Sequence, residues 1–394
     1  MKKKILFVID SLHSGGAEKS LISLLTLFDF QKYEVDLLMF SPNGLYLPLL
    51  PKEVNVIEVP VYMRNQMRGF KHLIRQRNFK QIFVRLGVST SLRIPHLKKN
   101  MHGAQINWGW ISKEIEKLDK KYDVAIAYSQ GMPTYFVAEK VSAVKKLSWV
   151  NIDYKIAGYN KEFDINYYEK FNQIIAVSEL CKDVLVSELP SMKSKVTVIY
   201  DIISPILIRS MSNENGGFTE EFEGMRILTI GRLVHQKGYE WAIEACHKLK
   251  EEGFKFKWFA IGEGELKTKL EETVKRLGLE DTFIFLGTHQ NPYTYLKQSD
   301  VYVQPSRFEG YGLAIAEARI LHIPIVTTNF TVVHNQITDR ENGLIVNMNS
   351  EDIYMGIKNM MEDGSLRQKI SSNLKKENVG TEEEIHKVYA LIES

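Results

Sequence analysis

Two glutamates that could bind hydroxyl groups, Glu309 and Glu317, lie eight positions apart with a Gly-Tyr-Gly turn between them. The apolar residues 301–303 before the turn favour a strand, and the run from Leu313 onward favours a helix. A helix that begins at such a turn presents free backbone N–H groups and the positive end of its dipole, which bind anions. The pattern predicts a site that binds an anionic group at the helix end and hydroxyl groups at the two carboxylates. A nucleotide sugar has both kinds of group.

A second candidate loop, residues 231–238, carries Arg232 and Lys237 between two glycines. An arginine can bind two oxygens of a diphosphate at once, and a lysine adds a point charge. Alone this pattern is weak, because cations on loops are usually only solvated. The sequence has no Asp-x-Asp pair that would hold a metal ion. We therefore expect no cofactor and no metal, and a diphosphate neutralised by side chains and helix ends.

The segment after the first apolar run contains Gly15 and Gly16 at the expected start of a helix. Paired glycines allow a phosphate group to approach the backbone closely, although a glycine helix entry without a ligand is also common. A dehydrogenase would need the G-x-G-x-x-G fingerprint with an acidic residue about 20 positions later. Neither half of the chain shows that fingerprint, which disfavours a dehydrogenase.

The composition is that of a globular protein with more than one domain. A length of 394 residues exceeds the usual size of one core, and no apolar run approaches the roughly 18 residues of a membrane span. The apolar run at the N-terminus ends after five residues at Asp10, which favours a strand over a signal peptide. Cys181 and Cys246 stand alone, without the spacing of a metal site or a disulfide framework, so we expect a cytoplasmic protein.

Charge is unevenly distributed, since residues 59–113 contain no Asp or Glu. The cations of this stretch are Arg64, Arg68, Lys71, Arg75, Arg77, Lys80, Arg85, Arg93, Lys98, Lys99 and Lys113. A basic helix with an apolar stripe is typical of an element at the anionic cytoplasmic membrane surface. An ordinary surface helix and an RNA-binding stripe are the alternatives. We expect the membrane surface as a partner and no nucleic acid.

Strands and helices alternate along the chain, which predicts an α/β fold with doubly wound parallel sheets. In the first half we expect strands at 5–9, 34–40, 54–59, 124–128, 146–150, 173–177 and 196–199, and helices at 17–27 and 179–187. In the second half we expect strands at 226–230, 256–261, 282–286, 301–304, 325–328 and 343–346, and helices at 239–252 and 266–277. The expected domains are 1–203 and 224–374, with a linker at 204–223 and a helical tail at 375–394.

The order and spacing of these motifs resemble those of glycosyltransferase family 4, and in particular of its members that build bacterial surface polysaccharides. The resemblance rests on Gly15-Gly16-Ala17-Glu18, Gly231-Arg232 with Lys237-Gly238, Gly262-Glu263-Gly264, and Glu309 to Glu317. It covers nearly the whole chain and is strongest from Arg226 to Glu317. It implies the GT-B architecture, in which two Rossmann-like doubly wound domains face each other across a cleft. The N-terminal domain would bind the acceptor, the C-terminal domain would bind the nucleotide sugar, and the tail helix would cross back to the first domain.

The resemblance also implies roles for single residues. Donor binding is implied for Arg232, Lys237, Gly262, His289, Glu309, Tyr311, Gly312, Leu313 and Glu317. Within this set Glu309 would lie near the sugar hydroxyls and the leaving group, Glu317 would hold the ribose, and His289 would meet the base. Gly15 and Gly16 would approach the phosphate side from the other domain.

One position departs from the family's pattern. Relatives often carry a histidine in the loop after the strand that ends here at Val150, and this sequence has Asn151 instead. An amide cannot act as a base, although it can hydrogen-bond a sugar hydroxyl. Asp153 is the nearest ionisable side chain, with a helix cap as its alternative role. The catalytic candidates are therefore Glu309, Asn151 and Asp153.

The resemblance implies a retaining, metal-independent hexosyltransferase. It would move a hexose from a nucleotide sugar, UDP-linked by preference, to a lipid-linked or growing glycan at the inner face of the cell membrane. The leaving diphosphate can accept the proton of the acceptor, so that catalysis rests on positioning and charge stabilisation. A phosphorylase or an epimerase on the same architecture, and a non-catalytic sugar-nucleotide-binding or assembly subunit, remain the alternatives.

Overall fold

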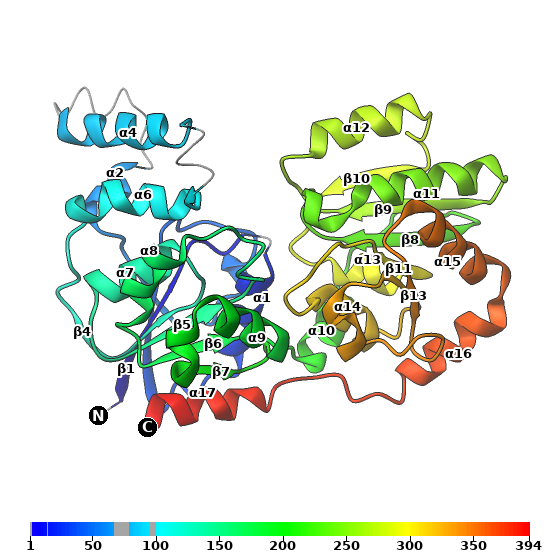
Figure 1. Cartoon of the computed structure of the whole chain (residues 1–394). Coiled ribbons are helices and arrows are strands. Elements are labelled where there is room, and N and C mark those ends of the chain that lie inside the picture. The colour runs from blue at the N-terminus through cyan, green and yellow to red at the C-terminus, as the bar shows by residue number, and fades with distance from the viewer. Residues whose placement is uncertain (1, 14, 67–78, 95–99) are drawn as a thin grey trace. The chain divides into compact units, whose positions relative to one another are not determined.

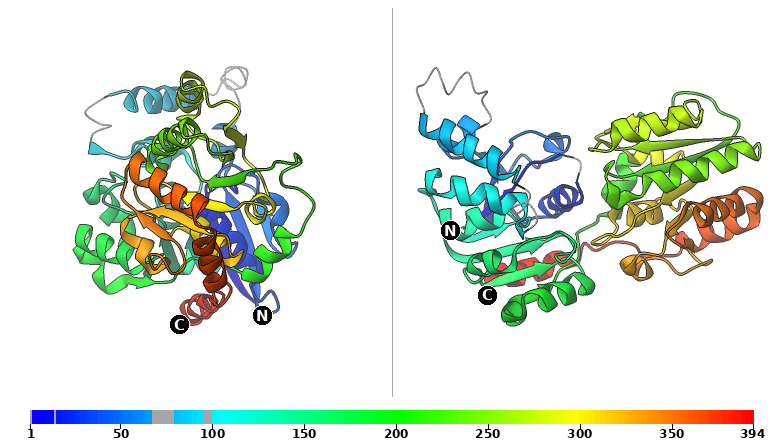
Figure 2. Two further views of the ribbon diagram at one scale, coloured as in Figure 1. Left: turned by 90° about the vertical axis from the view of Figure 1, so that its right-hand side faces the viewer. Right: turned by 45° about the horizontal axis from the view of Figure 1, so that its top comes forward.

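The protein forms two compact units, each built on its own parallel sheet with helices packed against it (Figures 1 and 2). The computed structural model describes residues 2–13, 15–66, 79–94 and 100–394. Unit 1 comprises Met1–Asp201 and Glu383–Ser394, and unit 2 comprises Ile202–Glu382. The prediction of two doubly wound α/β domains is confirmed.

The sheet of unit 1 has the strand order β3-β2-β1-β4-β5-β6-β7, and all its pairings are parallel. Its strands are β1 (Lys3–Ile9), β2 (Tyr33–Met39), β3 (Asn55–Ile57), β4 (Lys121–Ala127), β5 (Ser142–Val150), β6 (Gln173–Ala176) and β7 (Val196–Val198). The central strands form because their side chains are apolar on both faces, as in β1, where residues 5–9 are all buried. The strand order reverses between β1 and β4, so the loops after these two strands diverge at that point.

Helices connect the strands of unit 1. They are α1 (Gly16–Thr26), α2 (Val61–Gln66), α4 (Phe79–Ser91), α6 (Gly103–Ile111), α7 (Met132–Lys140), α8 (Lys161–Tyr168) and α9 (Glu179–Glu188). Part of the basic stretch thus lies on α2 and α4. Its residues Arg68, Lys71, Arg75, Arg77, Lys98 and Lys99 lie outside the described residues. Within the described ranges, no helix combines the length and hydrophobicity that crossing a bilayer requires.

The sheet of unit 2 has the order β10-β9-β8-β11-β12-β13 and is also parallel. Its strands are β8 (Met225–Ile230), β9 (Phe256–Ile261), β10 (Phe283–Gly287), β11 (Val301–Gln304), β12 (Ile325–Thr328) and β13 (Leu344–Val346). Its helices are α10 (Pro205–Ser212), α11 (Tyr239–Glu251), α12 (Lys267–Arg276), α13 (Tyr293–Lys297), α14 (Leu313–Ile320), α15 (Ser350–Glu362) and α16 (Gly364–Leu374). Here the order reverses between β8 and β11.

The segment expected as a linker, 204–223, differs from the expectation because its first part is the helix α10. The Ser204 hydroxyl caps this helix by accepting a hydrogen bond from the Leu207 backbone N–H, and Pro205 occupies its first turn. Ile208 and Met211 are buried, and α10 contacts α13 and α14. The segment therefore begins as a packed element of unit 2.

The C-terminal tail, expected to be helical over 375–394, is helical only in α17 (Glu384–Glu393). Before it the chain around Gly380 has no regular secondary structure, and Thr381 forms two hydrogen bonds with Ile203. Glycine disfavours a helix, and this pairing replaces the helical hydrogen bonds. Helix α17 belongs to unit 1, where Tyr389 stacks on Tyr33 with the ring centroids 5.4 Å apart.

Candidate functional site

The two loops with predicted anion-binding residues meet in unit 2 because their strands are neighbours. Strand β8 precedes residues 231–238, strand β11 precedes residues 305–312, and the two strands pair directly. The backbone N–H of Arg307 donates to the Gln236 carbonyl at 2.8 Å, and Gln236 Nε2 donates to the Phe308 carbonyl at 2.8 Å. The reversal of strand order in an open α/β sheet is where ligands usually bind.

Glu309 is the centre of this junction. Its Oε1 atom receives hydrogen bonds from Lys237 Nζ at 2.6 Å, from Ser306 Oγ at 2.6 Å and from Gln304 Nε2 at 2.9 Å. The side chains of Lys237 and Glu309 are only 16% and 9% exposed, so solvent screens this ion pair little. Within the described part of the chain, Glu309 Oε2 has no hydrogen-bond partner, and it is the oxygen that remains for a ligand.

A buried network supports the residues that hold Glu309. The Tyr302 hydroxyl hydrogen-bonds Gln304 Oε1, and Gln304 Nε2 also donates to Ser306 Oγ at 2.6 Å. The Ser306 carbonyl accepts a hydrogen bond from the Thr328 hydroxyl. Burial, together with the nearby Tyr239 and the carboxylates Glu309 and Glu317, raises the pKa of Tyr302 well above its ordinary value. Tyr302 therefore stays a neutral donor to this network.

Arg307 clamps the two loops together, a role that the sequence did not reveal. Its guanidinium donates to the His235 carbonyl at 2.6 Å and pairs with Glu240. The guanidinium also lies over the ring of Trp241, with its carbon 3.9 Å from the ring centroid. The clamp fixes the position of 231–238, where Lys237 lies.

The Gly-Tyr-Gly turn forms the N-terminus of α14 as expected. Gly312 has φ +90° and precedes the first helical residue, Leu313. Gln336 Nε2 donates to the Tyr311 carbonyl at 2.6 Å and holds the turn in place. Glu317 lies in the second turn of α14, where it is buried and accepts a hydrogen bond from the Tyr293 hydroxyl at 3.0 Å.

The other predicted donor residues line the same edge of the sheet. Arg232 is exposed on the loop after β8. A Cβ atom at Gly262, after β9, would lie 1.9 Å from the Gly231 carbonyl oxygen, so only glycine permits this approach. His289, after β10, lies beside Tyr295 with a centroid distance of 4.6 Å. The strand order β10-β9-β8-β11 places these loops in a row along one sheet edge. Their ligand roles stay predictions.

In unit 1, Asn151 is held against the loop after β4. Its Nδ2 atom donates to the Tyr128 carbonyl at 2.8 Å, and its backbone N–H donates to Gln130 Oε1 at 3.0 Å. Asn151 Oδ1 is buried without a partner among the described residues. Asp153 Oδ1 accepts hydrogen bonds from the backbone N–H groups of the second and third residues after it, at 3.0 and 3.1 Å. Asp153 therefore caps the turn of residues 154–158. The alternative expected above was the cap of a helix, and the next helix, α8, begins only at Lys161.

Gly15 and Gly16 begin α1 as expected. Gly15 is the residue before the helix, and Gly16 is the first helical residue. A Cβ atom at Gly15 would lie 2.0 Å from a carboxylate oxygen of Glu18, so the glycine makes room for this side chain. An approach of these glycines to a phosphate stays a prediction.

A buried carboxylate anchors the loop that follows Asn151. Asp164 of α8 accepts hydrogen bonds from the Tyr135 and Tyr154 hydroxyls, each at 2.6 Å, and from Gln105 Nε2 at 2.7 Å. Burial raises the pKa of Asp164, and the three hydrogen bonds partly oppose that effect. Tyr154 therefore ties the loop after β5 to the core of unit 1.

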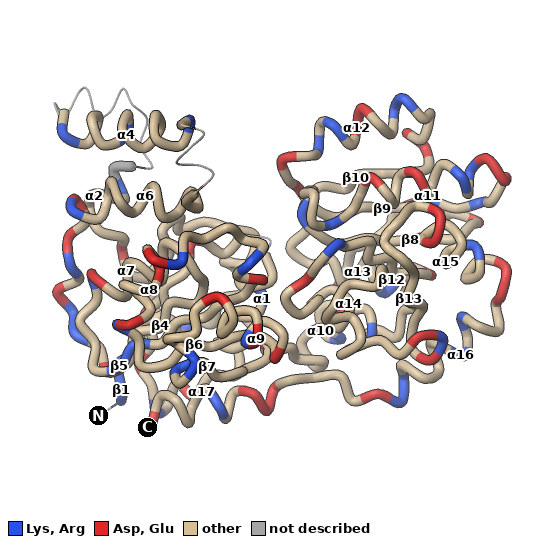
Figure 3. Tube along the Cα trace, viewed as in Figure 1, with Lys and Arg blue, Asp and Glu red and all other residues tan. Residues whose placement is uncertain are grey.

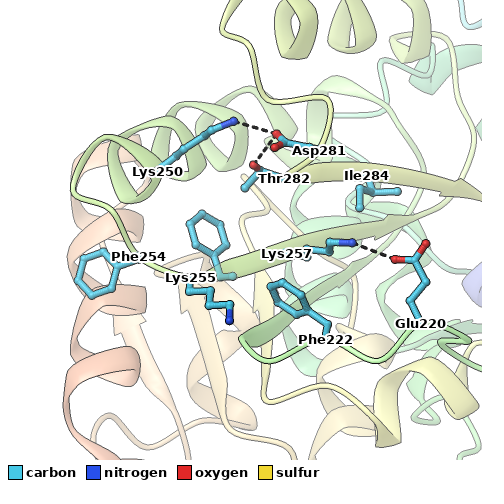
Figure 4. A pocket seen from close by; sticks show the side chains of 10 residues that line it. Glu220, Phe222, Lys250, Phe254, Lys255, Lys257, Asp281, Thr282 and Ile284 are labelled. Atoms are coloured by element: carbon cyan, nitrogen blue, oxygen red, sulfur yellow. Dashed lines mark hydrogen bonds and ion pairs between the residues drawn. The ribbon is translucent and has the colours of Figure 1, made fainter.

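A hollow of about 420 Å³ lies elsewhere, at the amino ends of the strands of unit 2 (Figure 4). Its cations are paired, with Lys250 2.8 Å from Asp281 and Lys257 2.9 Å from Glu220. Catalytic and binding loops of open α/β sheets follow the carboxyl ends of the strands, at the opposite edge. We therefore assign the site to the Glu309 junction and not to this hollow.

Comparison with known proteins gives matches over the same region and over the whole chain. Residues 218–377 match the family Glycosyl transferases group 1. An uncharacterized glycosyltransferase of Methanocaldococcus jannaschii is 30% identical over 170 residues, 41% of each protein. The N-acetylgalactosamine-N,N'-diacetylbacillosaminyl-diphospho-undecaprenol 4-alpha-N-acetylgalactosaminyltransferase of Campylobacter jejuni is 25% identical over 95% of this chain and 94% of its own length. The structure of a Staphylococcus aureus TarM mutant with fondaparinux, alpha-GlcNAc-glycerol and UDP superposes with a TM-score of 0.70 at 16% identity, covering 100% of both chains.

Proposed function

We propose that this chain is a retaining glycosyltransferase of cell-surface polysaccharide synthesis, because residues 218–377 match the glycosyl transferases group 1 family and its structural neighbours have the GT-B fold. It transfers a hexose from a UDP-linked sugar to a lipid-linked or growing glycan. The UDP bound to TarM supports the donor class, and the diphospho-undecaprenol in the name of the Campylobacter relative supports the acceptor class.

The convergence of Lys237, Ser306 and Gln304 on one oxygen of Glu309 carries the proposal. It fixes a carboxylate beside the N-terminus of α14 and leaves Oε2 to accept a hydrogen bond from a hydroxyl of the transferred sugar. Lys237 and the N–H groups at the start of α14 neutralise the diphosphate. Glu317, one turn further along the helix, binds the ribose.

Catalysis in this proposal depends on electrostatic preorganisation, in which positively charged side chains are already positioned at the leaving group. As the bond between the sugar and the diphosphate breaks, negative charge develops on the leaving oxygen, and Lys237 and Arg232 stabilise it. The same oxygen accepts the proton of the attacking hydroxyl, so the new bond forms on the face that the diphosphate leaves. No protein base and no metal ion take part in this proposal, and Asn151, as an amide, does not act as a base.

We further propose that the enzyme works at the cytoplasmic face of the membrane. The acid-free stretch 59–113 supports this location, because anionic lipids attract cations at about 1 kcal/mol for each Lys or Arg near the surface.

The direct test is release of nucleoside diphosphate by the purified full chain. UDP-, GDP- and dTDP-linked hexoses are each incubated with and without a lipid-linked acceptor fraction, in the presence and absence of a chelator. We expect acceptor-dependent UDP release that the chelator leaves unchanged, and NMR of the product should show the anomeric configuration of the donor. Tight UDP binding without release in any mixture would favour the non-catalytic subunit instead, and an inverted product would refute the retaining mechanism.

A further inference from the structure

Helix α4 of unit 1 exposes a stripe of large apolar side chains, Phe79, Phe83 and Leu86, which we call the α4 stripe. Their side chains are 69%, 67% and 51% exposed. Spacings of four and three residues place all three on one face of the helix. Leu92 and Ile94, directly after the helix, are exposed as well. Single exposed apolar residues are common, but a continuous group marks an interaction surface.

The opposite face of α4 holds the helix to unit 1. Gln81 is buried, and its Nε2 donates to the Tyr62 carbonyl at 2.9 Å. Trp110 Nε1 of α6 donates to Ser91 Oγ at 2.9 Å, and a Cβ atom at Gly87 would lie 2.5 Å from the Trp110 ring. The helix is thus fixed by close packing and buried hydrogen bonds. Turning the α4 stripe inward would break these contacts, so the stripe stays outward.

The charges around the α4 stripe decide which partner fits. The helix carries Lys80 and Arg85 and no Asp or Glu, as Figure 3 shows, although Lys80 lies 2.9 Å from Glu114 outside the helix. Arg93 is exposed just beyond the end of the helix. An anionic bilayer offers hydrocarbon to the stripe and phosphate groups to the cations. A second copy of this chain would instead bring the same acid-free segment against itself and place like charges opposite each other.

We propose that the α4 stripe is the element of this protein that inserts into the surface of an anionic bilayer. The proposal rests on the membrane partner put forward for the proposed function and names the residues that make the contact. The helix lies in the plane of the interface, with Phe79, Phe83 and Leu86 among the upper acyl chains and Arg93 at the phosphates. A helix of 13 residues is about 20 Å long, which suits this orientation.

Sedimentation of the full chain with lipid vesicles tests the proposal without any sugar nucleotide. The vesicles are pure phosphatidylcholine or a mixture with phosphatidylglycerol, at low and high salt. The test variant is Phe79→Ser with Phe83→Ser. The matched control is Val144→Ser with Ile206→Ser, which removes apolar side chains that are 85% and 79% exposed elsewhere. Arg93→Gln separates the electrostatic part of the binding.

We expect the wild type to bind the anionic vesicles and to bind less at high salt. The Phe79 and Phe83 variant should bind about tenfold or more weakly. Arg93→Gln should weaken binding to anionic vesicles about fivefold and leave neutral vesicles unaffected. The control variant should bind like the wild type. Arg93→Gln and the control variant should melt at the wild-type temperature, because the changed side chains are exposed. The Phe79 and Phe83 variant should melt within a few degrees of it, because Phe83 loses only its edge-on contact with the Trp110 ring.

Wild-type protein that stays in solution, or a Phe79 and Phe83 variant that binds as the wild type does, would overturn the proposal. Light scattering without vesicles measures whether the chain forms dimers. If the wild type is a dimer and the Phe79 and Phe83 variant is a monomer, the α4 stripe binds a second copy of the chain, and the proposal is refuted. The result is separate from that of the proposed function. A chain that binds vesicles through the stripe but releases no nucleoside diphosphate refutes only the transferase proposal.

Discussion

Lys237 Nζ lies 2.6 Å from Glu309 Oε1, although 72 residues separate the two in the sequence. The pairing joins the loop after β8 to the loop after β11 through Glu309 Oε1, and Glu309 Oε2 has no hydrogen-bond partner among the described residues. The diphosphate of a bound donor would compete with this carboxylate for the lysine. Under the proposed function, the pair would therefore couple the binding of the phosphates to the position of the Glu309 carboxylate beside the sugar.

Removal of this cation should slow transfer strongly without unfolding the protein. We expect Lys237→Ala to lower kcat about 10²–10³-fold, because both the developing charge on the diphosphate and the position of Glu309 lose their counterion. Initial rates of nucleoside diphosphate release measure the effect. Lys257→Ala is the matched control, since Lys257 pairs with Glu220 at 2.9 Å at the opposite edge of the same sheet. Full activity of Lys237→Ala would refute the assignment of the site.

The neutral donors to Glu309 should matter as well. Ser306→Ala removes a 2.6 Å hydrogen bond to the carboxylate, and we expect a roughly tenfold lower kcat with little change in the KM of the donor. Ser299→Ala serves as the control, because Ser299 is also buried and its hydroxyl donates to the Tyr295 carbonyl at 2.8 Å, away from the site. Equal kinetics of the two variants would mean that Ser306 does not position Glu309.

The contact of Gly238 with Pro305 should be sensitive to one added methyl group. Gly238 has φ +64°, and a Cβ atom there would lie 2.0 Å from the Pro305 carbonyl oxygen. Gly278 has φ +62° with open space around it, so Gly278→Ala measures the backbone strain alone, about 1–2 kcal/mol. We expect Gly238→Ala to lower the free energy of unfolding by clearly more than that and to reduce activity. Equal melting temperatures of the two variants would contradict the close contact.

Stability should depend on pH through Asp164. Burial raises the pKa of this carboxyl in the folded chain, so the folded state binds the proton more readily than the unfolded state. The free energy of unfolding should therefore rise as the pH falls from above the raised pKa toward 3.8, the ordinary value for Asp. Asp164→Asn removes this titration. The melting temperature of the wild type minus that of Asp164→Asn should increase as the pH is lowered. A difference that stays constant with pH would contradict the prediction.

The positions of most strands could be predicted from the sequence, because buried parallel strands are short continuous apolar runs. Strands β9, β11 and β12 have the expected bounds, and the others differ by a few residues. The sequence does not predict helix α10, because the helix is short, carries Pro205 in its first turn and is followed directly by the turn-forming residues 213–217. Its apolar face becomes evident only where α13 and α14 cover it. The tail helix was expected too long, because the pairing of Thr381 with Ile203 is not a local signal.

By itself, the sequence determined the doubly wound class of the fold and the loops that carry Glu309, Glu317, Arg232 and Lys237. Those features depend on local periodicity and on residue type at the ends of strands. Only the tertiary structure decided that Lys237, Gln304 and Ser306 converge on a single oxygen of Glu309, and that Arg307 holds their loops together. The physical reason is the strand order, since β8 and β11 become neighbours only through a long-range pairing. That pairing brings side chains from distant segments within hydrogen-bonding distance.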